Sequence, residues 1–211
     1  MMEKKTRGRP RAYDSEQALD RLTEVFWNKG FDDASLDDLA QAAGMNRPSL
    51  YRAFGDKAAM FRATQSRFAD RMNADIQTIL TRDIPFQARL ADLLDYLINV
   101  YQTPSGRGCF VMSVGAMKAP QDQALVDLMA EVFKQMEVRL IKALTEERAA
   151  GQLDAKADVQ SLGRMLALAM NGLTVRSRAG QDSQSLRMLA KNIQRTVQSF
   201  ACSDGKGEAT A

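Results

Sequence analysis

Residues 35–54, SLDDLAQAAGMNRPSLYRAF, predict two short helices joined by a sharp turn. Ser35 can cap the first helix, whose first turn holds two aspartates, and acidic residues stabilise the positive end of a helix. Gly44 supplies the turn, and Asn46 can cap the second helix. Arginine, serine and tyrosine lie on the outer side of that second helix, while Leu50 points inward. This arrangement is typical of a helix-turn-helix motif.

The composition excludes several classes of site. The chain has 211 residues and contains no His, which removes His-based catalytic triads and most zinc sites. Its two cysteines, Cys109 and Cys202, cannot form a disulfide framework and favour a reducing cytoplasm. No apolar run reaches the ~20 residues of a membrane span. We therefore expect a cytoplasmic protein without metal, cofactor or membrane partner, and we find no catalytic constellation that would make it an enzyme.

The apolar spacing along the chain is helical almost throughout. Glycine and proline fall where helices of ordinary length would end or begin. Residues 109–114 could pass for a strand, but one strand has no partner with which to pair. The sequence therefore predicts an all-α protein with about nine helices.

The charge is concentrated at the N-terminus. Five Lys and Arg residues and a single Glu give residues 1–11 a charge of +4, so the other 200 residues sum to −1. Arg7, Arg9 and Arg11 are separated by Gly and Pro, which hold the segment extended. Spaced arginines of this kind suit DNA phosphates and a narrow minor groove. The alternative is a disordered solubilising tail.

The last two predicted helices are unusually apolar. Residues 162–173 carry one charge, Arg164, and a helix that is apolar on all sides must be covered on all sides. We expect two chains to bury these helices in a four-helix bundle. The predicted seam of this homodimer consists of Leu162, Leu166, Met170, Leu173, Leu189, Ile193 and Val197. The alternative is a hairpin packed inside one chain.

Several segments together resemble the Tet repressor (TetR/AcrR) family of bacterial transcription regulators. The matching pieces are Phe-Trp-Asn-Lys-Gly-Phe at 26–31, the motif at 35–54 and the Asp-Lys pair at 56–57. The resemblance implies a TetR-type three-helix DNA-binding domain at 12–72 and a helical effector-binding and dimerisation domain at 73–202. The basic arm at 1–11 and a disordered tail at 203–211 flank them.

The resemblance also implies which residues contact DNA. They are Arg47, Pro48, Ser49, Tyr51, Arg52 and Lys57. Arg47 and Pro48 match positions over base edges, where an Arg can bind guanine through two hydrogen bonds. The other four match positions that contact phosphate, although Tyr51 could instead be a half-buried structural prop. Ala53 departs from the family pattern, which often has His or Trp there and gains a further phosphate contact.

In this family the C-terminal helices bind a small molecule, so the resemblance implies an effector pocket. The candidate lining residues are Phe68, Met72, Tyr96, Tyr101, Cys109, Phe110, Met112, Met117, Met129, Phe133 and Met136. Methionine and aromatic side chains form adaptable apolar cavities. Ordinary core packing is the alternative for each of these residues.

Cys109 follows Gly106-Arg107-Gly108 and is expected in the first turn of a helix. A helix N-terminus and a nearby Arg both favour the thiolate, which would suit a sensor of oxidants or electrophiles. A small buried hydrophobe is one alternative, and Cu(I) held by Cys109 with Met112 or Met117 is another.

The sequence thus predicts a dimeric DNA-binding regulator, specifically a repressor that binds a near-palindromic operator. A small apolar molecule or a thiol-reactive, oxidising species would release it. Two alternatives remain open at this point. One is an all-α binding or carrier protein whose helix-turn-helix is only structural, and the other is a transcriptional activator.

Overall fold

The computed structural model describes residues 14–103 and 108–201. Within these ranges the chain forms nine α-helices and no strand beyond an isolated bridge between Leu153 and Ala201, which confirms the predicted all-α fold. The α-helices are α1 (Ser15–Asp33), α2 (Leu36–Ala43), α3 (Arg47–Phe54), α4 (Lys57–Leu80), α5 (Phe86–Tyr101), α6 (Ala116–Lys118), α7 (Gln123–Ala149), α8 (Val159–Arg178) and α9 (Ser183–Gln198). A π-helix η1 (Val111–Gly115) and a 3₁₀ turn η2 (Ala119–Gln121) flank α6. None of the described helices combines the length and the apolar character needed to cross a membrane.

The chain divides into two compact units, Met1–Thr64 and Gln65–Ala211. The boundary lies within α4, whereas the sequence analysis placed it after residue 72. We describe the first part of α4 with the first unit and the remainder with the second. The predicted arm at 1–11 and tail at 203–211 lie outside the described residues.

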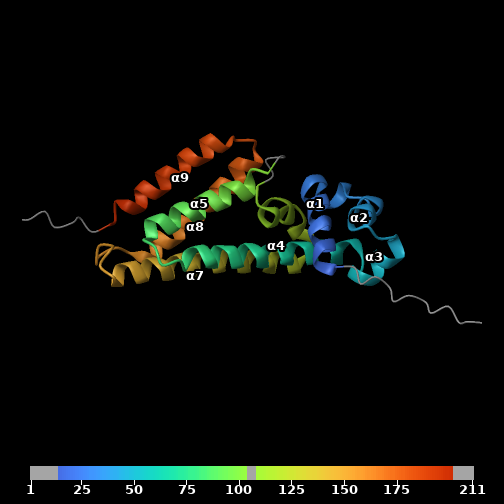
Figure 1. Cartoon of the computed structure of the whole chain (residues 1–211), viewed down its shortest axis with the longest axis horizontal. Helices are drawn as coiled ribbons and strands as arrows, with labels where there is room; N and C mark the ends of the chain where they lie inside the picture. Colours follow the sequence, from blue (N-terminus) through green and yellow to red (C-terminus); the bar gives the residue numbers. More distant parts are fainter. Residues whose placement is uncertain (1–13, 104–107, 202–211) are drawn as a thin grey trace, which may run out of the picture. The chain divides into compact units, whose positions relative to one another are not determined.

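In the first unit, α1, α2 and α3 follow one another through short turns (Figure 1). Ser35 and Asp38 form a capping box at the start of α2, in which each side chain accepts the backbone N–H of the other, at 3.1 and 3.0 Å. Gly44 ends α2 with φ 65° and ψ 31°, a left-handed conformation that glycine adopts without strain. These local signals position α3 immediately after α2.

The core of the first unit holds α3 in place through apolar and aromatic packing. Leu22, Leu39 and Leu50, one from each of the three helices, have no exposed surface. The rings of Phe26 and Phe61 meet edge to face, with their centroids 5.0 Å apart. One face of α3 is therefore committed to the core, and the opposite face remains free.

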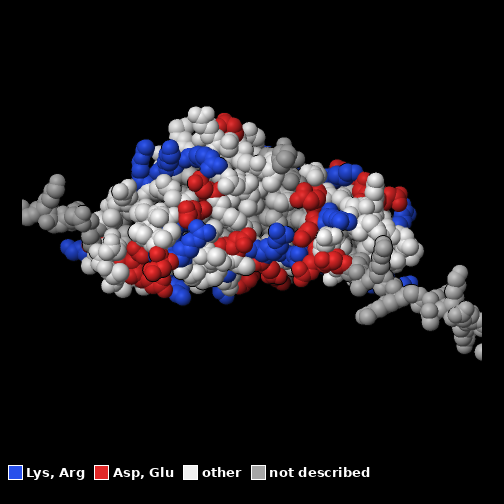
Figure 2. Space-filling model, viewed as in Figure 1, with Lys and Arg blue, Asp and Glu red and all other residues white. Residues whose placement is uncertain are grey.

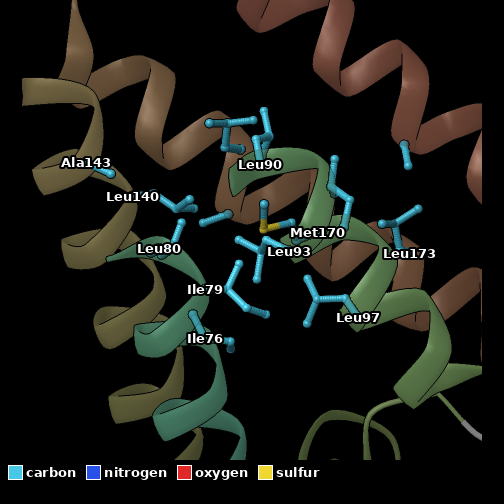
Figure 3. Close-up of a cluster of buried hydrophobic side chains, with 14 of the residues drawn as sticks. Ile76, Ile79, Leu80, Leu90, Leu93, Leu97, Leu140, Ala143, Met170 and Leu173 are labelled. Atoms are coloured by element: carbon cyan, nitrogen blue, oxygen red, sulfur yellow. The ribbon is translucent and has the colours of Figure 1, made fainter. Parts of the chain in front are cut away.

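In the second unit, α5 lies at the centre and packs against α7, α8 and α9. Figure 3 shows leucine side chains of α5 meeting residues of α4, α7 and α8 in one continuous cluster. Leu90, Leu93 and Leu97 recur at steps of three and four residues along α5 and are fully buried. This core, with Met170 and Leu173 from α8, holds the second unit together (Figure 3).

The segment from Gly108 to Gly115 crosses between α5 and α6 in an unusual conformation. Gly108 has φ 68°, and a side chain there would meet the Thr174 carbonyl oxygen at 2.8 Å. The residues that could have been a strand in sequence instead form η1, a π-helix, which is a rare element. Gly115 packs closely against Gln65: a Cβ atom would lie 2.8 Å from the Gln65 side-chain oxygen, so that side chain would have to shift.

Candidate nucleic-acid interface and ligand cavity

Helix α3 presents a polar face to solvent because its ends and its apolar side are specified locally. The Asn46 side chain accepts the Ser49 backbone N–H at 2.9 Å and so caps the helix. Pro48 lies in the first turn, where a missing N–H costs no hydrogen bond. Leu50 is fully buried, whereas Tyr51 is 43% exposed. The exposed residues of α3 are Arg47, Pro48, Tyr51 and Arg52.

Arg47, the residue expected to reach a base, is engaged within the unit. Its Nε and Nη2 atoms donate to the two carboxylate oxygens of Asp37 on α2, at 2.7 and 2.5 Å. The Arg47 hydrogen bond lowers the pKa of Asp37, and the same contact raises the pKa of Arg47. Both side chains are exposed, and solvent and salt screen an exposed ion pair, so this pair is a weak one. A fork that holds a carboxylate in this way can exchange it for a guanine edge.

Lys57 begins α4 and is anchored to α1. Its Nζ donates to the Asp32 carbonyl oxygen at 3.1 Å and lies 4.7 Å from the centre of the Phe31 ring. The ammonium group is thus held near the start of α4, where helix N–H groups also favour anions. Ser49 is only partly exposed, and its backbone N–H is used by the cap.

The charge on the described surface is mixed. On the face shown in Figure 2, Lys and Arg side chains lie among Asp and Glu side chains, with uncharged surface between them. The predicted strongly basic segment with Arg7, Arg9 and Arg11 lies outside the described residues. Within the first unit, Arg47 is held by Asp37, and Lys57 is held by the Asp32 carbonyl oxygen of α1.

A small interior cavity lies in the second unit. Its volume is about 30 Å³, enough for one or two water molecules and far below the ~300–1,000 Å³ of drug-sized ligand sites. Six of the predicted residues line it: Met72, Tyr101, Cys109, Met112, Phe133 and Met136. Sequence reasoning missed Ala69, Asn73, Ile76, Val111, Val132 and Asn171. Asn171 could have been noticed, because it is a lone uncharged polar residue in the apolar run 162–173.

The other predicted lining residues lie elsewhere. The Tyr96 hydroxyl donates to Asp75 at 2.8 Å. Phe110 is fully buried and stacks edge to face on Phe68, with the ring centroids 5.7 Å apart. Met129 is partly buried against the core, and Met117 is 73% exposed. These residues do not line the cavity, and most of them serve the packing that the sequence analysis named as the alternative.

The expectation that Cys109 has a lowered pKa is wrong. Cys109 lies directly before the first helical residue and is 3% exposed, and burial raises the pKa of its thiol to about 11. Backbone hydrogen bonds at this helix start oppose the shift without overcoming the desolvation of the thiolate. Met112 lines the same cavity as Cys109, whereas Met117 does not line it and is 73% exposed.

The predicted dimer seam also needs correction. Leu162, Leu166, Met170 and Leu173 are each at most 4% exposed and belong to the core of the single chain. On α9, Val197 is buried, while Leu189 and Ile193 are partly buried. The exposed apolar residues of α8 occupy the opposite side; they are Met165, Leu168 and Val175, at 56%, 72% and 67% exposure. An evenly apolar helix does not reveal by its sequence which stripe faces its own chain, and this is why the prediction chose the wrong one.

Comparisons with known proteins agree with this architecture. The family model described as "Bacterial regulatory proteins, tetR family" matches residues 18–64, and that of the "Tetracyclin repressor-like, C-terminal domain" matches residues 87–193. The chain is 29% identical over 191 residues to the HTH-type transcriptional repressor ComR of Escherichia coli (strain K12), covering 89% of this chain and 90% of that protein. It is 26% identical to the repressor BdcR of the same organism, covering 85% and 86% of the two chains.

A solved structure with the same fold contains DNA. It is a cysteine mutant of the TetR-family regulator CifR in complex with a 26-base-pair operator. The two chains are 26% identical and superpose with a TM-score of 0.79, covering 90% of this chain and 100% of the other. These relatives are regulators and not enzymes, as the sequence analysis predicted. The chain therefore belongs to the tetR family of bacterial regulatory proteins and is a DNA-binding transcriptional repressor of that family.

Proposed function

We propose that this repressor binds a near-palindromic operator as a homodimer and leaves it when a small apolar effector enters the second unit. The observation that carries the DNA-binding part is the exposed face of α3, with Arg47, Tyr51 and Arg52 on one side and buried Leu50 on the other. Such a protein acts where the DNA is, in the cytoplasm. Occupancy of the operator would block transcription.

Arg47 and Pro48 would contact base edges, with the Arg47 fork moving from Asp37 to guanine O6 and N7. Ser49, Tyr51, Arg52 and Lys57 would contact phosphate. The basic segment with Arg7, Arg9 and Arg11 would add affinity with little sequence information, because phosphate contacts position a protein without reading bases. The Asp37–Arg47 ion pair would then favour discrimination between bases. Arg47 must leave Asp37 to bind DNA, and only a base that binds the guanidinium well offsets the loss of that ion pair.

The homodimer would form through the exposed face of α8, Met165, Leu168 and Val175, with Met188 of α9, which is 60% exposed. Three large apolar side chains at three- and seven-residue steps form one continuous stripe on a helix. A stripe of this size is a normal sign of a partner surface. Two-fold pairing would give the assembly two α3 helices, one for each half of a palindrome.

The effector would occupy the cavity around Met72, Tyr101 and Met112. Because its volume is only about 30 Å³, any molecule larger than a few atoms must open it. The wall includes residues of α4, and α4 begins at Lys57 in the DNA-binding unit. A displacement of α4 would therefore affect both units. The buried thiol of Cys109, whose pKa is raised, favours a non-covalent apolar effector over a thiol-reactive one.

The test is selection of bound sequences from a random duplex pool, followed by sequencing of the retained DNA. We expect a palindrome whose half-sites are about one helical turn apart. A carrier protein with a structural helix-turn-helix would enrich nothing. Enrichment of a single unrepeated half-site would refute the dimer and leave the DNA-binding assignment standing.

The effector part is tested separately by thermal shift with benzene, a small apolar molecule that would have to open this cavity, since the dry cavity known to bind benzene measures about 150 Å³. We expect benzene to raise the melting temperature of the wild-type protein but not that of Ala69→Val, because Ala69 is a buried wall residue and the larger side chain fills the cavity. Equal shifts in both proteins would exclude this cavity as the binding site.

A further inference from the structure

A second recess in the second unit lies between α4 and α7, separate from the interior cavity. The two helices run alongside each other in Figure 1, and Arg139 of α7 bridges them. Its Nε donates to the Gln77 side-chain oxygen at 3.1 Å, and its Nη1 donates to the Asn73 side-chain oxygen at 2.9 Å. Both acceptors are neutral amides on α4.

Arg139 differs from other arginines that join elements of this unit. Arg82, Arg89 and Arg187 each bind a carboxylate, of Asp92, Glu147 and Asp95 respectively. Among the described residues, by contrast, no carboxylate lies within ion-pair distance of Arg139. Partial burial lowers the pKa of its guanidinium, and the charge of Glu131 on the same helix opposes this shift without overcoming it.

The geometry leaves donors of Arg139 available. A guanidinium has five N–H groups in a planar fork, and the two amide contacts use its Nε side and one Nη. The Nη2 atom makes no hydrogen bond to any described residue. Charged donors of this kind bind carboxylates strongly, because the hydrogen bonds are reinforced by charge.

The recess beside Arg139 is shaped for a small amphiphile. Its volume is about 240 Å³, eight times that of the interior cavity. Leu80, Val138 and Ala143 supply apolar wall. Lys142 adds a second cation, which lies 3.9 Å from Glu146 at the same recess, so two cations face one carboxylate.

We propose that this recess binds a small monoanion with an apolar body, an alkyl or aryl carboxylate. The carboxylate would take the unoccupied side of the Arg139 fork and the vicinity of Lys142, and the hydrocarbon would cover Leu80 and Val138. The proposal goes beyond the repressor function, because it concerns binding by the free protein and requires neither DNA nor the interior cavity.

The first experiment is isothermal titration of the DNA-free full chain with octanoate. Two controls separate the parts of the ligand: acetate carries the carboxylate without the octyl chain, and 1-octanol carries the chain without the carboxylate. We expect octanoate to bind with a Kd on the order of 1 mM or tighter, and each fragment to bind at least about tenfold more weakly. Absence of octanoate binding, or equal binding of octanol, would overturn the proposal.

The second experiment places a competing carboxylate in the recess. Val138 is 53% exposed, so Val138→Glu should fold normally while it offers Arg139 and Lys142 an internal partner. Val126→Glu is the matched control, since Val126 is 40% exposed on the same helix and lies outside the recess. We expect Val138→Glu to weaken octanoate about tenfold, and Val126→Glu to leave the affinity within about twofold.

Two further variants locate the ligand. Arg139→Gln should abolish the preference for octanoate over octanol, with thermal melting as the check that the helices remain packed. Ala69→Val, which fills the interior cavity, should leave octanoate affinity unchanged. Loss of binding in Ala69→Val with no effect of Val138→Glu would place the ligand in the interior cavity and refute the proposal.

Discussion

Helices α3 and α8 distribute their side chains between core and surface in opposite ways. In α3 polarity separates the two sides, because Leu50 is buried while Arg47, Tyr51 and Arg52 are exposed. In α8 both sides are apolar: Leu166 is 3% exposed and Leu168, two residues later, is 72% exposed. The polar residues of a helix such as α3 show in the sequence which face is exposed. When both faces are apolar, as in α8, the buried face is known only from the residues that pack against it.

The largest expected effect separates the two faces of α8 through the stability of the fold. Leu166→Ala removes a buried side chain from the core and should lower the free energy of unfolding by about 2–5 kcal/mol. Urea denaturation monitored by circular dichroism measures this change. Val126→Ala, at an exposed position on α7, should change it by no more than about 0.5 kcal/mol. Similar values for both variants would mean that α8 is not packed as described.

Next comes the outer face of α8. Leu168→Glu should leave the chain folded but charge the proposed dimer surface, because Leu168 is exposed in the single chain. Sedimentation velocity should show monomers, and operator affinity measured by fluorescence anisotropy should fall about 100-fold, or about 2.7 kcal/mol, as one half-site is lost. Val126→Glu should do neither. A persistent dimer in Leu168→Glu would move the interface away from α8.

On α3 the expected effect is smaller and confined to one base pair per half-site. Arg47→Ala should cost about 1–3 kcal/mol on the preferred operator and relax the base preference at that position. Lys57→Ala should weaken all sequences alike, because a phosphate contact carries no base information. Arg82→Ala removes an exposed, carboxylate-paired arginine of the second unit and is the control. If Arg47→Ala and Lys57→Ala behave identically, the assignment of Arg47 to a base edge is wrong.

The smallest expected effect concerns Asp37, the carboxylate that Arg47 would release on binding DNA. Asp37→Asn frees the guanidinium and should tighten operator binding only about twofold to fivefold, because an exposed ion pair is weak. Asp33→Asn, which removes a similar exposed charge from α1 without touching Arg47, controls for general electrostatics. In an Arg47→Ala background the effect of Asp37→Asn should shrink to that of the control. Persistence of the full effect there would exclude coupling between the two residues.

Much of the DNA-binding unit could be predicted because its signals are local. The caps at Ser35 and Asn46, the turn at Gly44 and the inward position of Leu50 all follow from near neighbours in the chain, and the structure has each of them. The ion pair between Arg47 and Asp37 was not predicted, since it joins two helices whose relative rotation no local pattern specifies.

In the second unit, the protonation of Cys109 and the lining of the cavity depend on burial, which local sequence signals do not show. The helix start at Cys109 suggested a thiolate, but desolvation outweighs the helix N–H groups and raises the pKa to about 11. Six of the predicted residues line the cavity, and Tyr96 and Phe110 do not, because a lining role depends on where neighbouring helices leave space.

By itself, the sequence determined the all-α class, the helix-turn-helix at 35–54 and the residues that α3 exposes, since these depend on hydrogen bonds and apolar spacing within a few residues. Only the tertiary structure decided which stripe of α8 belongs to the core and how large the cavity is. It also decided that Arg139 faces amides where other arginines face carboxylates. The physical reason is that burial and pairing depend on residues far apart in sequence, and their contacts exist only once the helices have packed.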